Sequence, residues 1–187
     1  MLENVHSRRV QYAHLRKLVS FSYVRLVVIA DTHLTAAVAT RLPKALLEAI
    51  EGADLVLHAG DVTTTAALEE LSALASVHCV LGNNDTTLVG LVPEQLRLTL
   101  AGVNVAMIHD SGSKAGRASR LSARFPDADL VVYGHSHVPD NSEGLGGQRL
   151  FNPGSPTQRR AQPLRTYGLI ELDDGQILSH EIRFLGP

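Results

Sequence analysis

Five short apolar runs, each followed at once by polar side chains, constrain the fold of this chain more than any other feature. Amphipathic stretches with helical periodicity, such as "LPKALLEAI" and "TTTAALEELSALA", lie between them. This alternation is typical of strands and helices wound into a layered α/β fold. The runs are "LVVIA" (26–30), "DLVLHA" (54–59), "VHCVL" (77–81), "VNVAMI" (103–108) and "DLVVY" (129–133).

The segments that follow these runs carry side chains able to bind metal. They read "DTH", "GDV", "GNND", "HD" and "GHSH" in chain order. Ligand sites of open α/β sheets form at the carboxyl ends of the strands, so we expect these segments to converge at one edge. The candidate ligands are Asp31, His33, Asp61, Asn83, His109, His135 and His137.

This mixture of carboxylate, imidazole and amide oxygen suits divalent first-row metals. Seven ligands are too many for one ion. Two ions about 3.5 to 4 Å apart that share a carboxylate would clamp both oxygens of a phosphoryl displacement. Gly60, Gly82 and Gly134 fit a site that the backbone must approach closely, although ordinary loop glycines explain each of them equally well.

After Pro139 the pattern changes to short strands joined by Gly-rich turns, which we interpret as antiparallel hairpins. The first part of the domain would then wind as α/β units, and the second would fold back as hairpins. We therefore predict an α/β fold with two packed mixed β-sheets flanked by helices.

Size and composition limit the class of protein. A chain of 187 residues with 44% apolar residues suits one domain, and we predict an N-terminal extension over 1–24 and a domain over 25–187. Cleavage of the first 30 residues as a signal peptide would remove the first strand. We therefore reject a signal peptide. A single cysteine, Cys79, cannot form an internal disulfide, and the two observations together favour a cytoplasmic protein. A net charge of −2 argues against nucleic acid as a partner, and no apolar run is long enough to span a membrane.

The motifs "DTH", "GD", "GNND", "H" and "GHSH", in this order, resemble the five motifs of the calcineurin-like metallophosphoesterases. The short length and the later "LFNPGSPTQRR" resemble the small bacterial and archaeal phosphodiesterase branch called the YfcE type. The resemblance covers about residues 25–183 and implies a four-layer sandwich. It implies a phosphoric ester hydrolase in which a hydroxide bridging two divalent metals attacks the phosphate.

The resemblance also assigns the ligands to two ions: Asp31, His33 and His137 to one, Asn83, His109 and His135 to the other, and Asp61 to both as the bridge. It implies two transition-metal ions as cofactors. Manganese is expected, with nickel, zinc, iron or cobalt as alternatives.

Two positions depart from the family pattern. Many relatives have a catalytic histidine after the metal-binding asparagine, where this chain has Asn84, whose amide cannot act as a general acid near neutral pH. The small phosphodiesterase branch commonly lacks this histidine too. Asp110 follows the fourth-motif histidine, where relatives often have glycine.

We expect a phosphodiesterase acting on a small phosphate ester. A phosphomonoesterase is the alternative enzyme, and a non-catalytic protein-interaction scaffold of the same fold is the alternative from another class. A homo-oligomer is left open.

Other polar residues receive supporting roles. We interpret His58 as a hydrogen-bonded core residue, and Asp85 and Asp110 as groups that could orient imidazoles or water. The "NPGS" segment at 152–155 fits a structural turn and a loop near the site equally well. Arg159 and Arg160 are interpreted as a solvated surface pair, with phosphate binding as the alternative.

Overall fold

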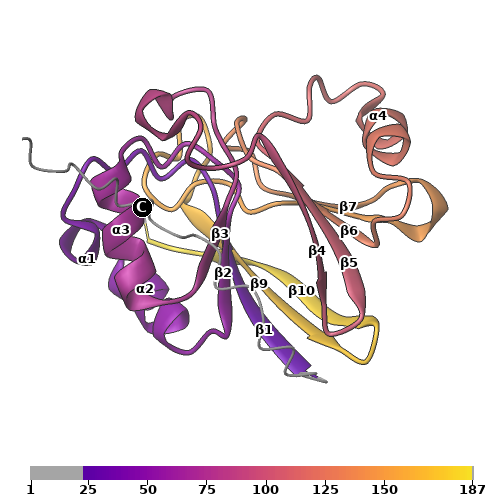
Figure 1. The fold of residues 1–187 in the computed structure, drawn as a ribbon, viewed down its shortest axis with the longest axis horizontal. Coiled ribbons are helices and arrows are strands. Elements are labelled where there is room, and N and C mark those ends of the chain that lie inside the picture. Colours follow the sequence, from indigo (N-terminus) through magenta and orange to yellow (C-terminus); the bar gives the residue numbers. More distant parts are fainter. Residues whose placement is uncertain (1–22, 187) are drawn as a thin grey trace, which may run out of the picture.

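Two five-stranded sheets pack face to face in the computed structural model, which describes residues 23–186 (Figure 1). The first sheet has the strand order β10-β9-β1-β2-β3. Its three parallel strands lie at the first three apolar runs, and β9, which precedes the last strand β10, pairs antiparallel with β1. The bounds are β1 (Tyr23–Ile29), β2 (Leu55–His58), β3 (Val77–Cys79), β9 (Thr166–Asp173) and β10 (Gln176–Phe184).

The second sheet has the order β4-β5-β6-β8-β7, with β5, β6 and β8 parallel and an antiparallel strand at each edge. Strand β4 lies outside the five predicted runs. Its sequence "QLRLTL" alternates apolar and polar residues, a pattern that indicates a half-buried strand. The bounds are β4 (Gln95–Leu100), β5 (Val103–Ile108), β6 (Leu130–Val132), β7 (Asp140–Glu143) and β8 (Arg149–Asn152).

Helices cover the outer faces of both sheets and complete four layers (Figure 1). Successive strand residues point to opposite faces, so Val27 and Ile29 pack under the helices of the first sheet while Leu26 and Val28 face the second sheet. Both faces of β1 are thus buried, which explains its unbroken apolar run. The predicted fold is confirmed. The helices are α1 (Val38–Arg41), α2 (Lys44–Glu51), α3 (Thr65–Leu74) and α4 (Arg117–Arg124), with short 3₁₀ turns η1 (Thr86–Leu88) and η2 (Leu145–Gly147).

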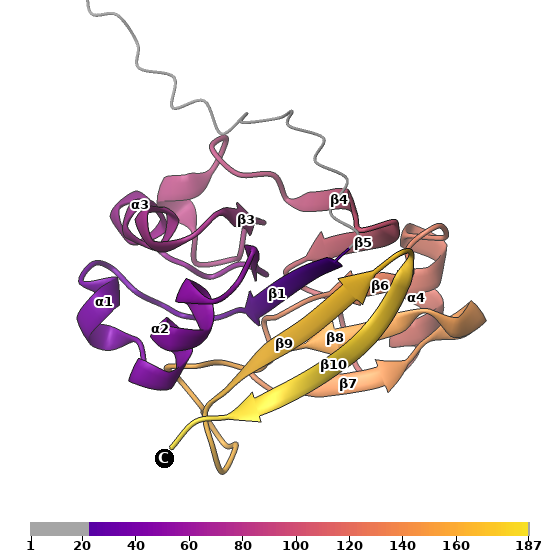
Figure 2. The ribbon, with the colours of Figure 1, turned by 90° about the horizontal axis from the view of Figure 1, so that it is seen from below.

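The late strands are only partly as predicted. Strands β9 and β10 form the expected antiparallel hairpin, seen in front of β1 in Figure 2. Strand β8 pairs antiparallel with β7, as expected for a hairpin, but parallel with β6, so the antiparallel expectation is wrong for that one pairing. Strand β8 forms the hairpin with β7 and also extends the parallel part of the second sheet beside β6.

Strand β1 begins earlier than the predicted domain start at residue 25. Tyr23 and Val24 pair with Asp173 and Leu172 of β9, so the last two residues of the predicted extension are part of the sheet. The rest of the predicted extension, residues 1–22, lies outside the described residues.

The ends of the parallel strands meet at one edge of the two sheets, at the top of Figure 1. Backbone hydrogen bonds continue past the strands and hold the emerging loops together. Asp31 N donates to Gly60 O at 2.9 Å, and Gly134 N donates to His109 O at 2.9 Å. Within the described part of the chain, no helix has the length and apolar character required to cross a lipid bilayer.

Candidate metal centre

The first group of predicted ligands joins the segments after β1 and β6. His137 Nε2 lies 3.4 Å from Asp31 Oδ1 and 3.3 Å from His33 Nε2. The two imidazole rings stack with centroids 5.2 Å apart. Asp31 and His137 are buried and His33 is half-buried. Three ligand atoms far apart in the sequence are therefore gathered within reach of one ion.

The second group joins the segments after β3, β5 and β6. Asn83 Oδ1 lies 3.0 Å from His109 Nε2 and 2.8 Å from His135 Nδ1. His109 is buried, whereas Asn83 and His135 are exposed. This group thus forms the open side of the centre.

Asp61 connects the two groups. Its Oδ2 lies 3.7 Å from His33 Nε2 and 3.6 Å from His109 Nε2. Asn84 holds this carboxylate with two hydrogen bonds, from its backbone N to Oδ1 at 2.8 Å and from its side-chain Nδ2 to Oδ2 at 2.6 Å. All eight predicted site residues are therefore brought together.

The backbone at this edge is strained. Left-handed backbone is uncommon for residues other than glycine and persists only where the surroundings enforce it. Such strain concentrates at functional sites because it aims side chains at a common point. Five of the seven predicted ligands have positive φ: Asp31 at 53°, His33 at 47°, Asp61 at 60°, His135 at 66° and His137 at 57°.

Three glycines leave room for the ligands. A Cβ at Gly60 would lie 2.6 Å from His109 Nδ1, and one at Gly134 would lie 2.9 Å from Asp31 Oδ2. A Cβ at Gly82 would overlap Asp61. These glycines therefore sit where the backbone closely approaches predicted ligands, because any side chain there would displace His109, Asp61 or Asp31.

Backbone carbonyls orient two of the imidazoles. His109 Nδ1 donates to Ala59 O at 2.7 Å, and His137 Nδ1 donates to Gln158 O at 2.6 Å. A carbonyl can only accept, so each Nδ1 carries the hydrogen and each Nε2 keeps its lone pair for a ligand.

The buried carboxylate of Asp31 fits a metal. Burial, helped by the nearby charge of Asp61, raises the pKa of Asp31 to about 8. Both of its oxygens are buried without a hydrogen-bond partner, which is costly for a carboxylate unless a cation satisfies them. Burial also lowers the pKa of His33 and His137, which favours the neutral, ligating form.

Asp61 is electrostatically different from Asp31. Burial acts to raise its pKa, but the hydrogen bonds from Asn84 and the nearby His109 and His33 outweigh burial and lower the pKa overall. Asp61 is thus held as a carboxylate between the two groups, ready to interact with cations on either side.

His58 is a hydrogen-bonded core residue, as predicted. It is fully buried, and its Nε2 lies 2.9 Å from Thr32 Oγ1. Burial lowers the pKa of His58 to about 3. It supports the ligand-bearing segment after β1 through Thr32.

This pKa predicts acid sensitivity. The pKa of His58 in the folded protein lies below its value of about 6.5 in the unfolded chain, so the unfolded chain takes up a proton first as the pH falls. The free energy of unfolding is therefore highest above pH 6.5 and decreases as the pH falls. The free energy of unfolding of the parent should fall by about 1.4 kcal/mol per pH unit between pH 6 and 4, and His58→Gln should remove this dependence. Denaturant unfolding of the metal-free protein across this range measures it. Parallel pH profiles for parent and variant would contradict the prediction.

Asp85 and Asp110 accept hydrogen bonds from backbone amides and not from imidazoles, so the expectation that they orient imidazoles is wrong, while a role in orienting water stays a prediction. The buried Asp85 carboxylate instead accepts hydrogen bonds from three backbone amides: Asp61 N at 2.9 Å, Thr63 N at 2.7 Å and Gly82 N at 2.7 Å. Asp110 is exposed and accepts from Gly112 N. Asp85 thus fastens the loop after β2 to the loop after β3, because only a carboxylate offers enough acceptors at that point.

Asp85→Asn is expected to destabilise the protein by about 1–3 kcal/mol, because an amide group leaves at least one of these buried N–H donors without an acceptor. Asp110→Asn is the matched control and should change stability by less than about 0.5 kcal/mol. Denaturant unfolding of the three proteins tests this. Equal stabilities for both variants would refute the role of Asp85.

The segment from 152 to 158 supports the centre. Asn152 Nδ2 donates to Gly134 O at 2.8 Å, and Ser155 Oγ donates to Asp31 O at 2.8 Å. Thr157 Oγ1 donates to Thr32 O at 2.8 Å. The "NPGS" segment, in which Gly154 N also donates to Asn152 Oδ1 at 2.9 Å, is therefore a loop near the site that holds two segments with predicted ligands.

Sequence reasoning missed a second support, the cluster of Arg117, Tyr133 and Asp140. The Tyr133 hydroxyl donates to Asp140, which joins the two ends of the loop carrying His135 and His137. Arg117 of α4 pairs with Asp140 at 3.2 Å and stacks over the Tyr133 ring. The position of Tyr133 and Asp140 on either side of "GHSH" was the available signal.

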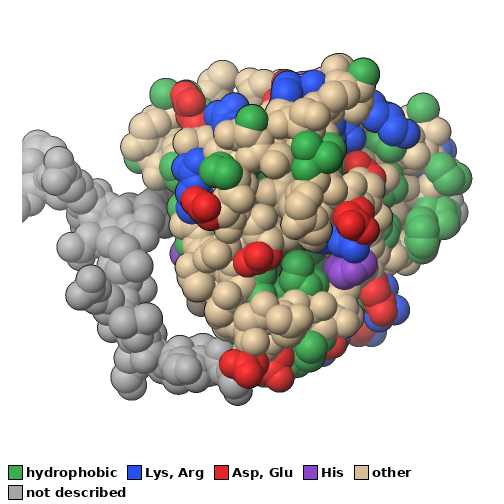
Figure 3. Space-filling model, turned by 90° about the vertical axis from the view of Figure 1, so that its right-hand side faces the viewer, with side chains coloured by type: hydrophobic (Ala, Val, Ile, Leu, Met, Phe, Trp, Pro, Cys, Tyr) green, Lys and Arg blue, Asp and Glu red, His purple; other side chains and the backbone are tan. Residues whose placement is uncertain are grey.

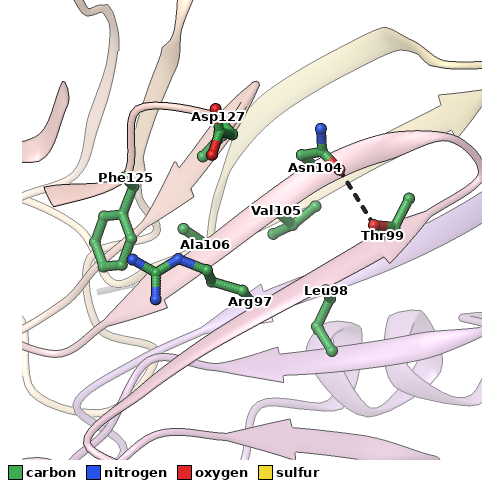
Figure 4. Close-up of a pocket in the computed structure, with 9 residues that line it drawn as sticks. Arg97, Leu98, Thr99, Asn104, Val105, Ala106, Phe125 and Asp127 are labelled. Atoms are coloured by element: carbon green, nitrogen blue, oxygen red, sulfur yellow. Dashed lines mark hydrogen bonds between the residues drawn. The ribbon is translucent and has the colours of Figure 1, made fainter. Parts of the chain in front are cut away.

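A separate cavity lies away from these ligands. It has a volume of about 210 Å³ and opens on the outer face of the second sheet, where Arg97 stacks over Phe125 (Figure 4). No predicted ligand lines it. On the face drawn in Figure 3, basic and acidic side chains are interspersed, and no broad basic field suited to nucleic acid is seen there.

Together, two helix-flanked sheets and a His/Asp cluster at the strand ends define an α/β protein with a candidate divalent-metal site. Residues 24–175 match the model of the calcineurin-like phosphoesterase superfamily domain. The chain belongs to this superfamily, and its small relatives agree with the YfcE-type assignment.

Two archaeal relatives are probable metallophosphoesterases. The protein of Methanothermobacter thermautotrophicus is 36% identical over 71% of this chain and 77% of its own length. That of Methanocaldococcus jannaschii is 34% identical over 79% of this chain and 75% of its own.

Solved structures share the fold. A Thermotoga maritima protein is 27% identical with a TM-score of 0.66, over 87% of this chain and 99% of that one. The zinc complex of Vps29 from Entamoeba histolytica is 22% identical with a TM-score of 0.68, over 86% of this chain and 98% of that one. The chain is thus a probable metallophosphoesterase with a candidate site for divalent metal.

Proposed function

We propose that the chain is a phosphodiesterase that hydrolyses small phosphate esters with two divalent metal ions. The observation that carries the proposal is the position of Asp61, whose Oδ2 lies within 3.7 Å of a histidine of each ligand group. A carboxylate so placed can be shared by two cations. Superfamily membership supports a phosphoric ester as the substrate.

The seven proposed ligands form two sets that share one carboxylate: Asp31, His33 and His137 for one ion, Asn83, His109 and His135 for the other, and Asp61 for both. When bound, the ions supply a nucleophile at neutral pH by lowering the pKa of water, and they neutralise charge on the phosphate. Manganese is the first candidate. Zinc is the next, because the Entamoeba Vps29 of the same fold has been solved with it.

The protein's own groups orient the reaction. Ala59 O and Gln158 O hold the imidazoles of His109 and His137 in the ligating tautomer. The substrate would approach from the exposed side, at Asn83 and His135. The buried side, built on Asp31, excludes water from the carboxylates and so strengthens their hold on cations.

We propose a diester rather than a monoester because the small phosphodiesterase branch also commonly lacks a histidine at the position of Asn84, whose amide donates to Asp61 and cannot protonate a leaving group. This agrees with the resemblance to the small phosphodiesterase branch. We also retain a cytoplasmic location in the proposal, supported by the free, buried Cys79.

The test is metal analysis together with hydrolysis of bis(4-nitrophenyl) phosphate and 4-nitrophenyl phosphate. We expect up to two ions per chain, faster cleavage of the diester, and loss of activity on chelation that manganese restores. Faster cleavage of the monoester would favour a phosphomonoesterase. Bound metal with no hydrolysis of either ester would favour a scaffold. Absence of metal under saturating manganese or zinc, with activity that survives chelation, would refute the proposal.

A further inference from the structure

The two adjacent arginines after "NPGS" differ in what their side chains do. Arg159 folds back on its own turn, where its Nη1 donates to Gln162 O at 2.8 Å. Arg160 reaches the metal centre instead, and its Nη1 lies 3.5 Å from the backbone O of His135. Both arginines are exposed, as a solvated surface pair requires, but their side chains have different partners.

The segment that carries Arg160 is fastened to the first ligand group of the centre, at the segment after β1 and at His137. Ser155 and Thr157 donate to carbonyls of the segment after β1, and Gln158 O accepts from His137 Nδ1. Arg160 itself has a φ of 49°, a backbone conformation that its surroundings must enforce. The position of Arg160 beside the ligands is thus built into the loop.

The charge of Arg160 acts on the centre. It opposes the rise in pKa that burial causes at Asp31, and it adds to the lowering of the pKa that burial causes at His33 and His137. Among the residues that the structure describes, no carboxylate pairs with Arg160, and the 3.5 Å contact is its one hydrogen bond. Most of its N–H donors therefore face solvent on the exposed side of the centre, beside His135.

We propose that Arg160 binds the phosphate group of the substrate at the metal centre, and that Arg159 does not. A guanidinium matches two oxygens of a phosphate, and it stays charged at any working pH. The proposal rests on the proposed function in taking a phosphoric ester as the ligand. It adds Arg160, which is not one of the proposed metal ligands, as a residue that sets the affinity for phosphate.

Inorganic phosphate is the probe that separates this inference from hydrolysis. Calorimetric titration of the manganese-loaded protein should show Arg160→Ala binding phosphate about tenfold or more weakly than the parent. Arg159→Ala is the matched control, with the same charge change one residue away, and should bind like the parent. Arg160→Lys should recover part of the affinity, because a point charge remains. Metal content should stay unchanged in all three variants.

Kinetics give a second measurement. With bis(4-nitrophenyl) phosphate, Arg160→Ala should raise KM about tenfold and change kcat less, because the lost contact holds the substrate in the ground state too. If the parent hydrolyses no ester, the proposed function fails while the phosphate titration still tests Arg160. Equal phosphate affinity for Arg160→Ala and Arg159→Ala would overturn the inference. Loss of metal in Arg160→Ala would also overturn it, because the residue would then hold the His135 loop rather than phosphate.

Discussion

Asp61→Ala is expected to remove both metal ions and to lower diester hydrolysis by more than about 100-fold. Loss of an outer partner of a metal ligand already costs about 10- to 100-fold. Asp61 is placed to contact both ligand groups, since its Oδ2 lies 3.7 Å from His33 Nε2 and 3.6 Å from His109 Nε2. Its removal should therefore affect both ions and the nucleophile together.

His33→Ala is the informative comparison, because it removes a ligand of one group only. It should retain more metal and more activity than Asp61→Ala. Asp110→Asn controls for the loss of charge, because Asp110 is an exposed carboxylate beside His109. This variant should keep full metal content. Metal analysis and initial rates at saturating manganese measure all three variants, and circular dichroism checks that each is folded. Asp61→Ala protein that keeps two ions would refute the shared-ligand role.

The second large effect concerns the leaving group. Without a general acid at Asn84, the departing oxygen must leave as an anion or take a proton from water. The rate should therefore fall steeply as the pKa of the leaving group rises, and nitrophenyl esters should far exceed alkyl esters. A positioned acid typically contributes about 10²- to 10⁴-fold. A series of diesters with graded leaving groups, measured at fixed metal and pH, gives this slope.

Asn84→His tests the cause of that slope. The new imidazole should accelerate esters with poor leaving groups and do little for good ones. The gain is limited because Asn84 Nδ2 also donates to Asp61 Oδ2, a hydrogen bond that the substitution removes. Asn84→Ala isolates this second effect, because it loses the hydrogen bond and supplies no acid. A flat leaving-group series in the parent would mean that another residue already protonates the leaving oxygen.

Strands and candidate ligands could be recognised from the sequence because their signals are local. The run before Asp31 is apolar throughout because both faces of β1 are buried, and β5 (Val103–Ile108) has the bounds of its apolar run. The candidate ligands follow these strands within one to five residues. Strand β4 carried an equally local signal in its alternation, but its polar residues kept it outside the apolar runs.

Supporting contacts could not be predicted, because they join segments that are distant in the chain. Ser155 and Asp31 are 124 residues apart, and Asp85 binds amides 22 and 24 residues before it. Hydrogen bonds of this kind depend on where loops pass each other, which no local pattern records. The sequence likewise could not distinguish Arg159 from Arg160, because the two arginines are adjacent and chemically identical.

The sequence by itself thus determined the layered α/β fold, the seven candidate ligands and their order, since periodicity and residue chemistry are properties of short segments. Tertiary structure alone decided that β8 joins the parallel sheet, that Asp85 holds backbone rather than imidazole, and that Arg160 rather than Arg159 reaches the centre. The physical reason is that packing two sheets brings separate loops to one edge, and the burial, strain and hydrogen bonds there arise only from that encounter.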